Sequence, residues 1–302
     1  KKIGQNIKFD FIVFYKCGIT LSSMEDTMLM SYVLDAGKNR HNMDTLSEIH
    51  LGHKTISFKE MVGTGKKEIN FSEVELDKAK DYAAEDADVT FRLYKKFVKN
   101  LKSEKMINIY EIFEKPLIKI LAFMEIEGVE IDSKFLKFLS SKFEKKIQKL
   151  EKEVFKISKK EFNIASPKQL GEIIYNDLKI AGLKKTKKGS FATSASVLED
   201  LAFKGHEFPK LILDWRQVSK LKNTYSDALP EHLNPNTKRV HTSFLLAATT
   251  TGRLASSDPN LQNIPIKSED GKDIRKAFTA KKGHLLISAD YNQIAVSYTH
   301  LR

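Results

Sequence analysis

The sequence has a single cysteine, no long apolar run and an excess of basic over acidic residues. Cys17 alone cannot form a disulfide framework, so the disulfide-stabilised secreted domains are excluded and a reducing cytoplasm is favoured. No stretch approaches the roughly 20 apolar residues that a membrane span needs. No secretory apolar segment opens the chain, although Lys1 is not typical of a native start. We therefore expect a cytoplasmic protein with no membrane partner.

The basic excess is large. Lys and Arg number 51 against 39 Asp and Glu, which gives a formal net charge of +12 and a pI near 9.4. Such a balance favours a polyanionic partner. A biased coding composition, rich in Lys, Ile and Asn together, explains the same numbers, so charge alone leaves both readings open. With 302 residues, 41% hydrophobic and 30% charged, the chain has the size and composition of about two globular domains.

Near the end of the chain, the apolar run over residues 285–289 ends in Asp290. This pattern predicts a buried strand that presents the carboxylate at its edge. A carboxylate there can hold a divalent cation, or it can cap the helix that follows. The spacing alone does not separate these alternatives.

Asp10 lies inside a nearly continuous apolar run, residues 4–14, that is an unusual helix candidate. A buried carboxylate without a partner is either protonated or strongly destabilising. Asp10 is therefore expected either to cap a local backbone segment or to bind a cation.

Residues 76–97 have the apolar period of a long helix, with Asp86 on the expected core face and Tyr82 one turn before it. A tyrosine hydroxyl beside a metal-held carboxylate can orient an attacking water. The acidic residues Asp81, Glu85 and Asp88 are expected on a solvated face, where Asp88 can pair with Arg92. The predicted core face comprises Ala79, Ala83, Val89 or Thr90, Leu93 and Phe97.

A second long amphipathic helix is predicted over residues 133–158, with lysines covering its polar face. The next helix should start with Ser166 as N-cap and Pro167 in its first turn. A basic loop over residues 184–190 and a helix from about residue 194 follow. Lysines on such a loop suit phosphate contacts without sequence reading. Residues 240–250 alternate as a strand does.

Two motifs in this order carry a family resemblance. TGRLASSDPNLQNIP at 251–265, followed by SADYNQI at 288–294, resembles the palm of the family A DNA polymerases, the bacterial DNA polymerase I group. The resemblance implies that Asp290 ligates Mg²⁺, or Mn²⁺, in a two-metal site. It places Arg253, Gln262, Asn263 and Gln293 against the primer–template minor groove, where every correct pair presents acceptors. It also places Arg216, Lys220, Lys222, Asn223 and Thr224 along the duplex product.

A second resemblance lies upstream. NIKFD at 6–10 and YAAEDADVT at 82–90 resemble the second and third motifs of the DEDD-type 3′–5′ exonucleases, with tyrosine in the third, and residues 26–46 resemble the same domain. Carried across by position, Asp10 and Asp86 become metal ligands and Tyr82 positions the hydrolytic water, while Asn6 and Phe9 shape the site. The first motif, Asp-x-Glu on a strand, would precede Lys1.

The two resemblances imply an α/β, ribonuclease H-like exonuclease part (residues 1–103), then a connecting helix and a mainly helical thumb (104–228). The first strands of an α+β palm (229–294) would follow. Ala295-Val296-Ser297 depart from the family's Glu-Leu-Arg, so residues 295–302 are expected to be a non-native tail. Because each site then holds about half of its carboxylates, we expect the chain to be inactive by itself.

The expected function of the parent enzyme is extension of primer–template DNA with deoxynucleoside triphosphates, with 3′–5′ proofreading, by a monomer. One alternative is a stand-alone DEDD-type exonuclease with a helical DNA-binding extension. That alternative explains Asp10, Tyr82 and Asp86 but not the motif at 251–265. A non-catalytic DNA-binding protein is the third reading.

Overall fold

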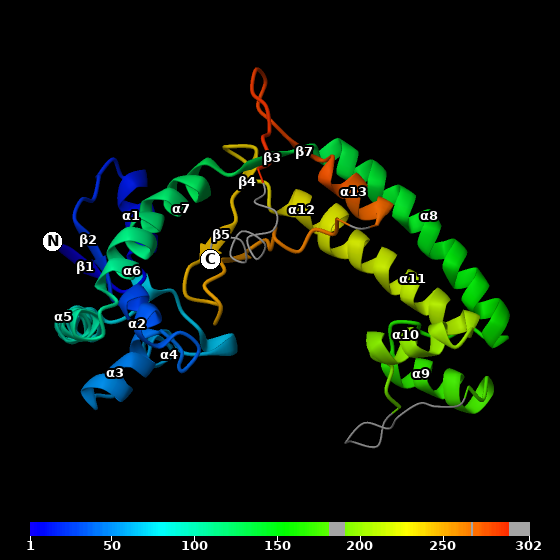
Figure 1. The fold of residues 1–302 in the computed structure, drawn as a ribbon, viewed down its shortest axis with the longest axis horizontal. Helices are drawn as coiled ribbons and strands as arrows, with labels where there is room; N and C mark the ends of the chain where they lie inside the picture. The colour runs from blue at the N-terminus through cyan, green and yellow to red at the C-terminus, as the bar shows by residue number, and fades with distance from the viewer. Residues whose placement is uncertain (181–190, 267, 290–302) are drawn as a thin grey trace, which may run out of the picture. The chain divides into compact units, whose positions relative to one another are not determined.

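The computed structural model describes residues 1–180, 191–266 and 268–289 (Figure 1). It is mostly helical, with a few short strands. The chain divides into two compact units: Lys1–Gly128 with His241–Gln262, and Val129–Val240 with the described residues from Asn263 onward. Each unit has its own hydrophobic core. The domain boundaries expected from the sequence remain predictions, and the compact units divide the chain at other points.

The first unit is built mainly from helices around a parallel pair of strands, β1 and β2, in which Lys2 pairs with Met24 and Gly4 with Asp26. A later antiparallel pair, β5 and β6, is part of the same unit. Its elements are β1 (Lys2–Gly4), α1 (Ile7–Lys16), β2 (Met24–Asp26), α2 (Thr27–Asp35), α3 (Met43–Leu51), α4 (Phe58–Val62), α5 (Leu76–Ser103), α6 (Ile107–Ile109), α7 (Lys115–Glu127), β5 (Ser243–Leu245) and β6 (Ala255–Ser257).

Helix α5 confirms the predicted helix and extends it to Ser103. Its apolar period buries Val89, Leu93 and Phe97 in the core of the first unit, as the spacing indicates. Ala83, which was predicted on this face, is exposed instead. The buried face starts only at Val89, so the first turns of α5 lie outside the core.

A single carboxylate joins the starts of α1 and α2. Asp26 is fully buried, and its side chain accepts hydrogen bonds from the backbone N–H groups of Asn6 and Ile7 at the start of α1, at 3.1 and 2.9 Å. It also accepts from Met28 and Leu29 in the first turn of α2, at 2.9 and 3.4 Å. Burial disfavours the charged form of the carboxyl group more than these hydrogen bonds favour it, so the pKa of Asp26 is raised to about 6. Asp26 therefore caps two helices at once.

The second unit is a helical body with a three-stranded antiparallel sheet in the order β4-β3-β7. Its elements are β3 (Val129–Ile131), α8 (Ser133–Ser158), α9 (Pro167–Glu172), α10 (Ala195–Phe203), α11 (Glu207–Leu221), α12 (Ala228–Glu231), β4 (Arg239–Val240), α13 (Glu269–Arg275) and β7 (Phe278–Thr279). A short π-helix, η4 (Ile173–Asp177), follows α9, and another, η5 (Lys222–Asp227), follows α11.

Helix α8 has the predicted amphipathic form. The Asp132 side chain caps it by accepting from Phe135 N at 2.9 Å, and its buried stripe includes Leu136, Phe143 and Val154. Ser166 and Pro167 start α9 as predicted. The strand expected over residues 240–250 is not continuous: Val240 ends β4, and Ser243–Leu245 form the short strand β5, which pairs with β6. In the described part of the chain, no helix is both long and apolar enough to cross a membrane.

The double cap makes a stability prediction. Replacing Asp26 with Ala leaves four buried or half-buried N–H groups without their acceptor, so we expect a loss of roughly 2–4 kcal/mol in unfolding free energy. Urea denaturation followed by far-UV circular dichroism measures it. Ser57→Ala removes one of the two bonds of the α4 capping box and should cost about 1 kcal/mol. Equal losses in the two variants would contradict the double cap.

Candidate functional site

Two predicted carboxylates share one cavity in the first unit. Asp10 reaches it from α1 and Asp86 from α5, and Gln5 lines it from the segment between β1 and α1. The cavity has a volume of about 470 Å³ and is closed on other sides by Met43 and Thr90. Residues 76 positions apart in the sequence therefore come together as the exonuclease resemblance implies.

Burial acts on both carboxylates in the same direction. It raises the pKa of half-buried Asp10, and it is also the main reason that the pKa of Asp86 is raised. The Tyr82 hydroxyl donates to Asp86 and partly offsets this effect. The Oδ1 atom of Asp86 is buried and has no hydrogen-bond partner. A buried carboxylate oxygen left unpaired is costly unless something else binds it.

The donor set fits a divalent cation of the Mg²⁺ or Mn²⁺ type. Such ions prefer carboxylate oxygens, and the carboxylates of Asp10 and Asp86 both line this cavity. Among the described residues, no cluster of three or more His, Cys, Asp and Glu side chains could hold a metal. Asp10 and Asp86 can thus supply two ligands of a larger set.

Tyr82 stays protonated at neutral pH. Its own burial, followed by the negative charge of Asp86, raises the pKa of its hydroxyl to about 12. The hydroxyl is therefore a hydrogen-bond donor next to Asp86.

Two phenylalanine rings that pack against Tyr82 were not predicted from the sequence. Phe58 and Phe71 stack with their ring centroids 5.8 Å apart, and each packs against Tyr82, at 6.2 and 5.9 Å. Both phenylalanines are 40% exposed or more. The signal available in the sequence was a single aromatic residue within each of two polar segments, SFKE and NFSE.

The predicted environment of Glu85 was wrong. It was predicted on a solvated face, but its carboxylate lies 2.7 Å from His53 Nε2 and accepts from Ile56 N at 2.6 Å. These bonds fix the loop that leads into α4 and Phe58. Its neighbours behave as predicted, since Asp81 is exposed and Asp88 pairs with Arg92 at 3.4 Å.

The predicted minor-groove residues lie on exposed segments. Arg253 is exposed on the hairpin between β5 and β6, and its carbonyl accepts from Thr249 Oγ1 at 2.7 Å. Gln262 and Asn263 are exposed as well. The Asp258–Pro259 peptide, between Arg253 and Gln262, is cis. Asp290, Gln293 and the basic loop at 184–188 lie outside the described residues.

A groove of about 580 Å³ in the second unit collects three of the predicted duplex contacts, Arg216, Lys220 and Asn223. Arg216 donates to the carbonyl of Thr193 at 2.6 Å, just before α10, and burial lowers its pKa. Lys222 is turned to the protein instead, pairing with Asp227 at 2.8 Å and Glu144 at 3.5 Å. Thr224 is exposed and is not part of the groove lining.

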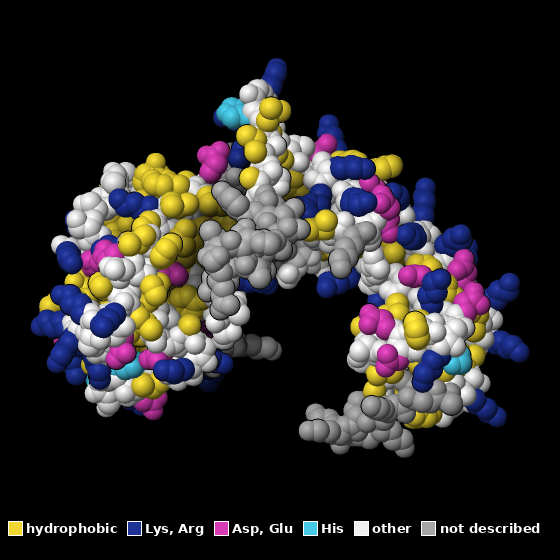
Figure 2. Space-filling model, viewed as in Figure 1, with side chains coloured by type: hydrophobic (Ala, Val, Ile, Leu, Met, Phe, Trp, Pro, Cys, Tyr) yellow, Lys and Arg dark blue, Asp and Glu magenta, His cyan; other side chains and the backbone are white. Residues whose placement is uncertain are grey.

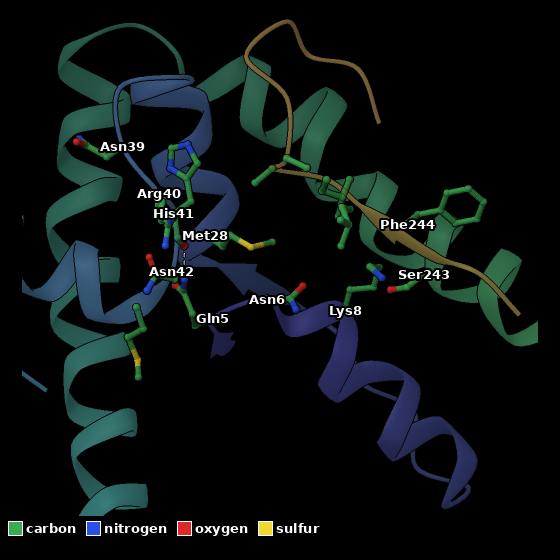
Figure 3. A pocket seen from close by; sticks show the side chains of 15 residues that line it. Gln5, Asn6, Lys8, Met28, Asn39, Arg40, His41, Asn42, Ser243 and Phe244 are labelled. Carbon is green, nitrogen blue, oxygen red and sulfur yellow. Dashed lines mark hydrogen bonds between the residues drawn. The ribbon is translucent and has the colours of Figure 1, made fainter. Parts of the chain in front are cut away.

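Another cavity of the first unit, about 730 Å³ in volume, brings the start of α1 together with β5 (Figure 3). Figure 3 shows Lys8 of α1 beside Ser243 of β5, with Gln5 and Asn42 farther along the same cavity. Lys8 forms a buried ion pair with Glu125 of α7, and Glu125 also accepts from Phe244 N at 2.6 Å.

Two known protein families match parts of this chain. Residues 133–298 match DNA polymerase family A, and residues 1–102 match the 3′–5′ exonuclease family. The chain belongs to DNA polymerase family A. The resemblance drawn from the palm motifs is confirmed, and the match over residues 133–298 covers a region that a stand-alone exonuclease leaves unexplained.

Similar proteins align with nearly the whole length of this chain. It is 50% identical to DNA polymerase I of Rhizobium leguminosarum and 44% identical to that of Pseudomonas aeruginosa, in each case over 97% of this chain. The chain spans 29% and 32%, respectively, of the length of these two relatives. The POL domain of Pol1 from M. smegmatis, solved with DNA primer–template and dNTP, aligns with a TM-score of 0.79 and 28% identity. That alignment covers 93% of this chain and 46% of the solved chain.

The shared cavity predicts a measurable cation affinity. Asp86→Asn removes a charged ligand, so Mn²⁺ binding to the 302-residue chain should weaken by about tenfold or more. Electron paramagnetic resonance of free Mn²⁺ measures the change. Asp81→Asn makes the same substitution on an exposed turn of α5 and should have no effect. Equal weakening by both variants would exclude Asp86 as a ligand.

Proposed function

We propose that the chain is part of a bacterial-type DNA polymerase I that extends primer–template DNA and trims its 3′ ends. In this proposal residues 1–103 are the later part of a ribonuclease H-like exonuclease domain. Residues 104–228 are the connecting helix and thumb, and residues 229–294 are the start of the palm. The observation that carries the proposal is the cavity that Asp10 and Asp86 both line, with Tyr82 next to Asp86, in the exonuclease-matching part of a family A polymerase.

In the exonuclease site, Asp10 and Asp86 would hold Mg²⁺ or Mn²⁺, which supplies positive charge to the scissile phosphate and lowers the pKa of a bound water. The Tyr82 hydroxyl, protonated and next to Asp86, would hold a water by hydrogen bonding. Phe58 and Phe71 offer exposed ring faces on which the bases of a single strand can stack without sequence preference. Glu85 and His53 keep the loop before Phe58 in place.

In the polymerase part, Arg253, Gln262 and Asn263 supply donors for minor-groove acceptors, which are common to all correct base pairs. Gln293 is proposed to join them. Arg216, Lys220 and Asn223 line a groove suited to phosphates of the duplex product. Lys222 and Thr224 are proposed to lie along the same duplex. Asp290 is proposed as the metal ligand of the palm.

The charge of the chain supports a nucleic-acid partner. Figure 2 shows lysine and arginine side chains spread over the visible faces of both units. With a net charge of +12, binding to a polyanion should depend steeply on salt, because each phosphate contact releases counterions. Deoxynucleoside triphosphates are the proposed co-substrates, and a cytoplasmic monomer is the proposed form.

The proposed sites make a prediction about the 302-residue chain alone. It should bind primer–template DNA, more weakly as salt rises, but neither extend nor trim it, because two carboxylates do not complete a two-metal site. Fluorescence anisotropy measures binding, and gel analysis of labelled primer with Mg²⁺ measures both activities. Failure to bind DNA at low salt would contradict the proposal, and extension or trimming above a blank preparation would contradict the assigned sites.

Arg253 provides a second test. If it donates to the primer-terminal pair, Arg253→Ala should weaken primer–template binding by roughly 10- to 100-fold, the effect of one good base contact. Replacing the terminal guanine with 3-deazaguanine removes the N3 acceptor and should weaken wild-type binding while hardly affecting the variant. Arg92→Ala, which removes an arginine paired on α5, is the control. Additive losses from Arg253→Ala and 3-deazaguanine would show that Arg253 has only a structural role.

A further inference from the structure

The hydroxyl group of Tyr32 connects the two ends of the turn that precedes Arg253. Tyr32 lies on α2, within the exonuclease-matching residues, and is 4% exposed. Its hydroxyl donates to the carbonyl of Thr249 at 2.8 Å and accepts from the N–H of Gly252 at 3.1 Å. One side chain therefore uses both hydrogen-bonding directions of its hydroxyl on a single turn.

The turn itself is exposed and has little else to hold it. Thr250, Thr251 and Gly252 are exposed, and Gly252 has the positive φ of +78° that favours glycine. The bond from Thr249 Oγ1 to the Arg253 carbonyl closes the turn from within. Below it, a Cβ atom on Gly37 would come within 2.8 Å of Thr250 Cγ2, so the segment after α2 lies directly against the turn.

Tyr32 is itself held in place. Its ring meets the His41 ring edge to face, with centroids 5.5 Å apart, and His41 Nδ1 lies 2.9 Å from Ser31 Oγ. The start of α2 is fixed by the Asp26 cap. The strand that leads toward the turn is also bound to α7, because Phe244 N donates to Glu125, which in turn forms the buried ion pair with Lys8 of α1. The backbone at Gly252 is therefore bonded to a rigid support.

We propose that Tyr32 is a positioning residue for Arg253, so that a helix of the exonuclease part sets how the polymerase part reads the primer terminus. This inference rests on the proposed minor-groove role of Arg253. The guanidinium can donate to a base acceptor only when its backbone is held within a narrow range of orientations. The two bonds of the Tyr32 hydroxyl hold the residues immediately before Arg253 and need no contact with DNA.

Tyr32→Phe tests the proposal because it removes only the hydroxyl and keeps the ring against His41. Primer–template duplexes that end in guanine or in 3-deazaguanine are titrated with the wild-type chain, Tyr32→Phe, Arg253→Ala and the double variant. We expect roughly a tenfold penalty for 3-deazaguanine in the wild type and less than about a threefold penalty in Tyr32→Phe. Arg253→Ala and the double variant should show the same small penalty, because they share one lost contact.

Tyr110→Phe is the matched control. Its hydroxyl is also buried, accepts from Asp26 N at 2.9 Å and donates to Glu25 at 3.0 Å, so its loss destabilises the same unit. It should lower the melting temperature and keep the full 3-deazaguanine penalty. Gly37→Ala disturbs Thr250 without touching Tyr32, and it decides the question if Tyr32→Phe does not fold. A reduced penalty in Gly37→Ala supports control of Arg253 through the turn.

Two results would overturn the proposal, and they are distinguishable. In the first, folded Tyr32→Phe keeps the full loss of affinity for 3-deazaguanine, whereas Arg253→Ala does not. This result would support the minor-groove contact of Arg253 and exclude the role of Tyr32. If the wild-type chain binds duplexes ending in guanine and in 3-deazaguanine equally well, Arg253 does not contact the N3 acceptor. The positioning role of Tyr32 is then excluded as well. A reduced penalty in Tyr110→Phe as large as that in Tyr32→Phe would assign the effect to general destabilisation.

Discussion

The Asp26 carboxylate is the interaction on which the first unit most depends. It lies at the end of β2, is fully buried and accepts N–H groups from the first turns of two helices. Asn6 adopts a left-handed conformation with φ 60° just before α1, which asparagine tolerates better than most residues. This conformation turns the chain from β1 toward the carboxylate. The directions in which α1 and α2 leave the strand pair therefore depend on a single side chain.

Each of these helices then positions side chains used elsewhere in the unit. Helix α1 carries Asp10 to the cavity that it shares with Asp86, and it carries Lys8 to the buried pair with Glu125. Helix α2 carries Tyr32 to the turn before Arg253. The candidate exonuclease site and the proposed support of the polymerase site thus originate from the same capped junction. This also gives a physical reason why residues His241–Gln262 belong to the first compact unit.

Much of this could be predicted from the sequence, where local patterns decide the outcome. The long apolar period of α5 and α8 and the Ser166-Pro167 start of α9 depend on neighbours within a few turns, and all three are present. The meeting of Asp10 with Asp86 was accessible only through the motif resemblance. Asp26 was missed as a cap because its partners at α1 lie about 20 residues away, and no local spacing indicates such a bond. Glu85 was misjudged for the same reason, since its partners His53 and Ile56 come from another segment.

We infer that this capped junction brings Asp10 to Asp86 to form a cation site. Anomalous diffraction from a crystal of the 302-residue chain grown with Mn²⁺ tests it most directly, because the signal locates the metal without reference to any activity. The account predicts a peak within coordination distance, about 2.0–2.3 Å, of carboxylate oxygens from both residues, including Asp86 Oδ1. Mn²⁺ bound elsewhere, with the Asp10–Asp86 cavity containing only water at saturating metal, would contradict it.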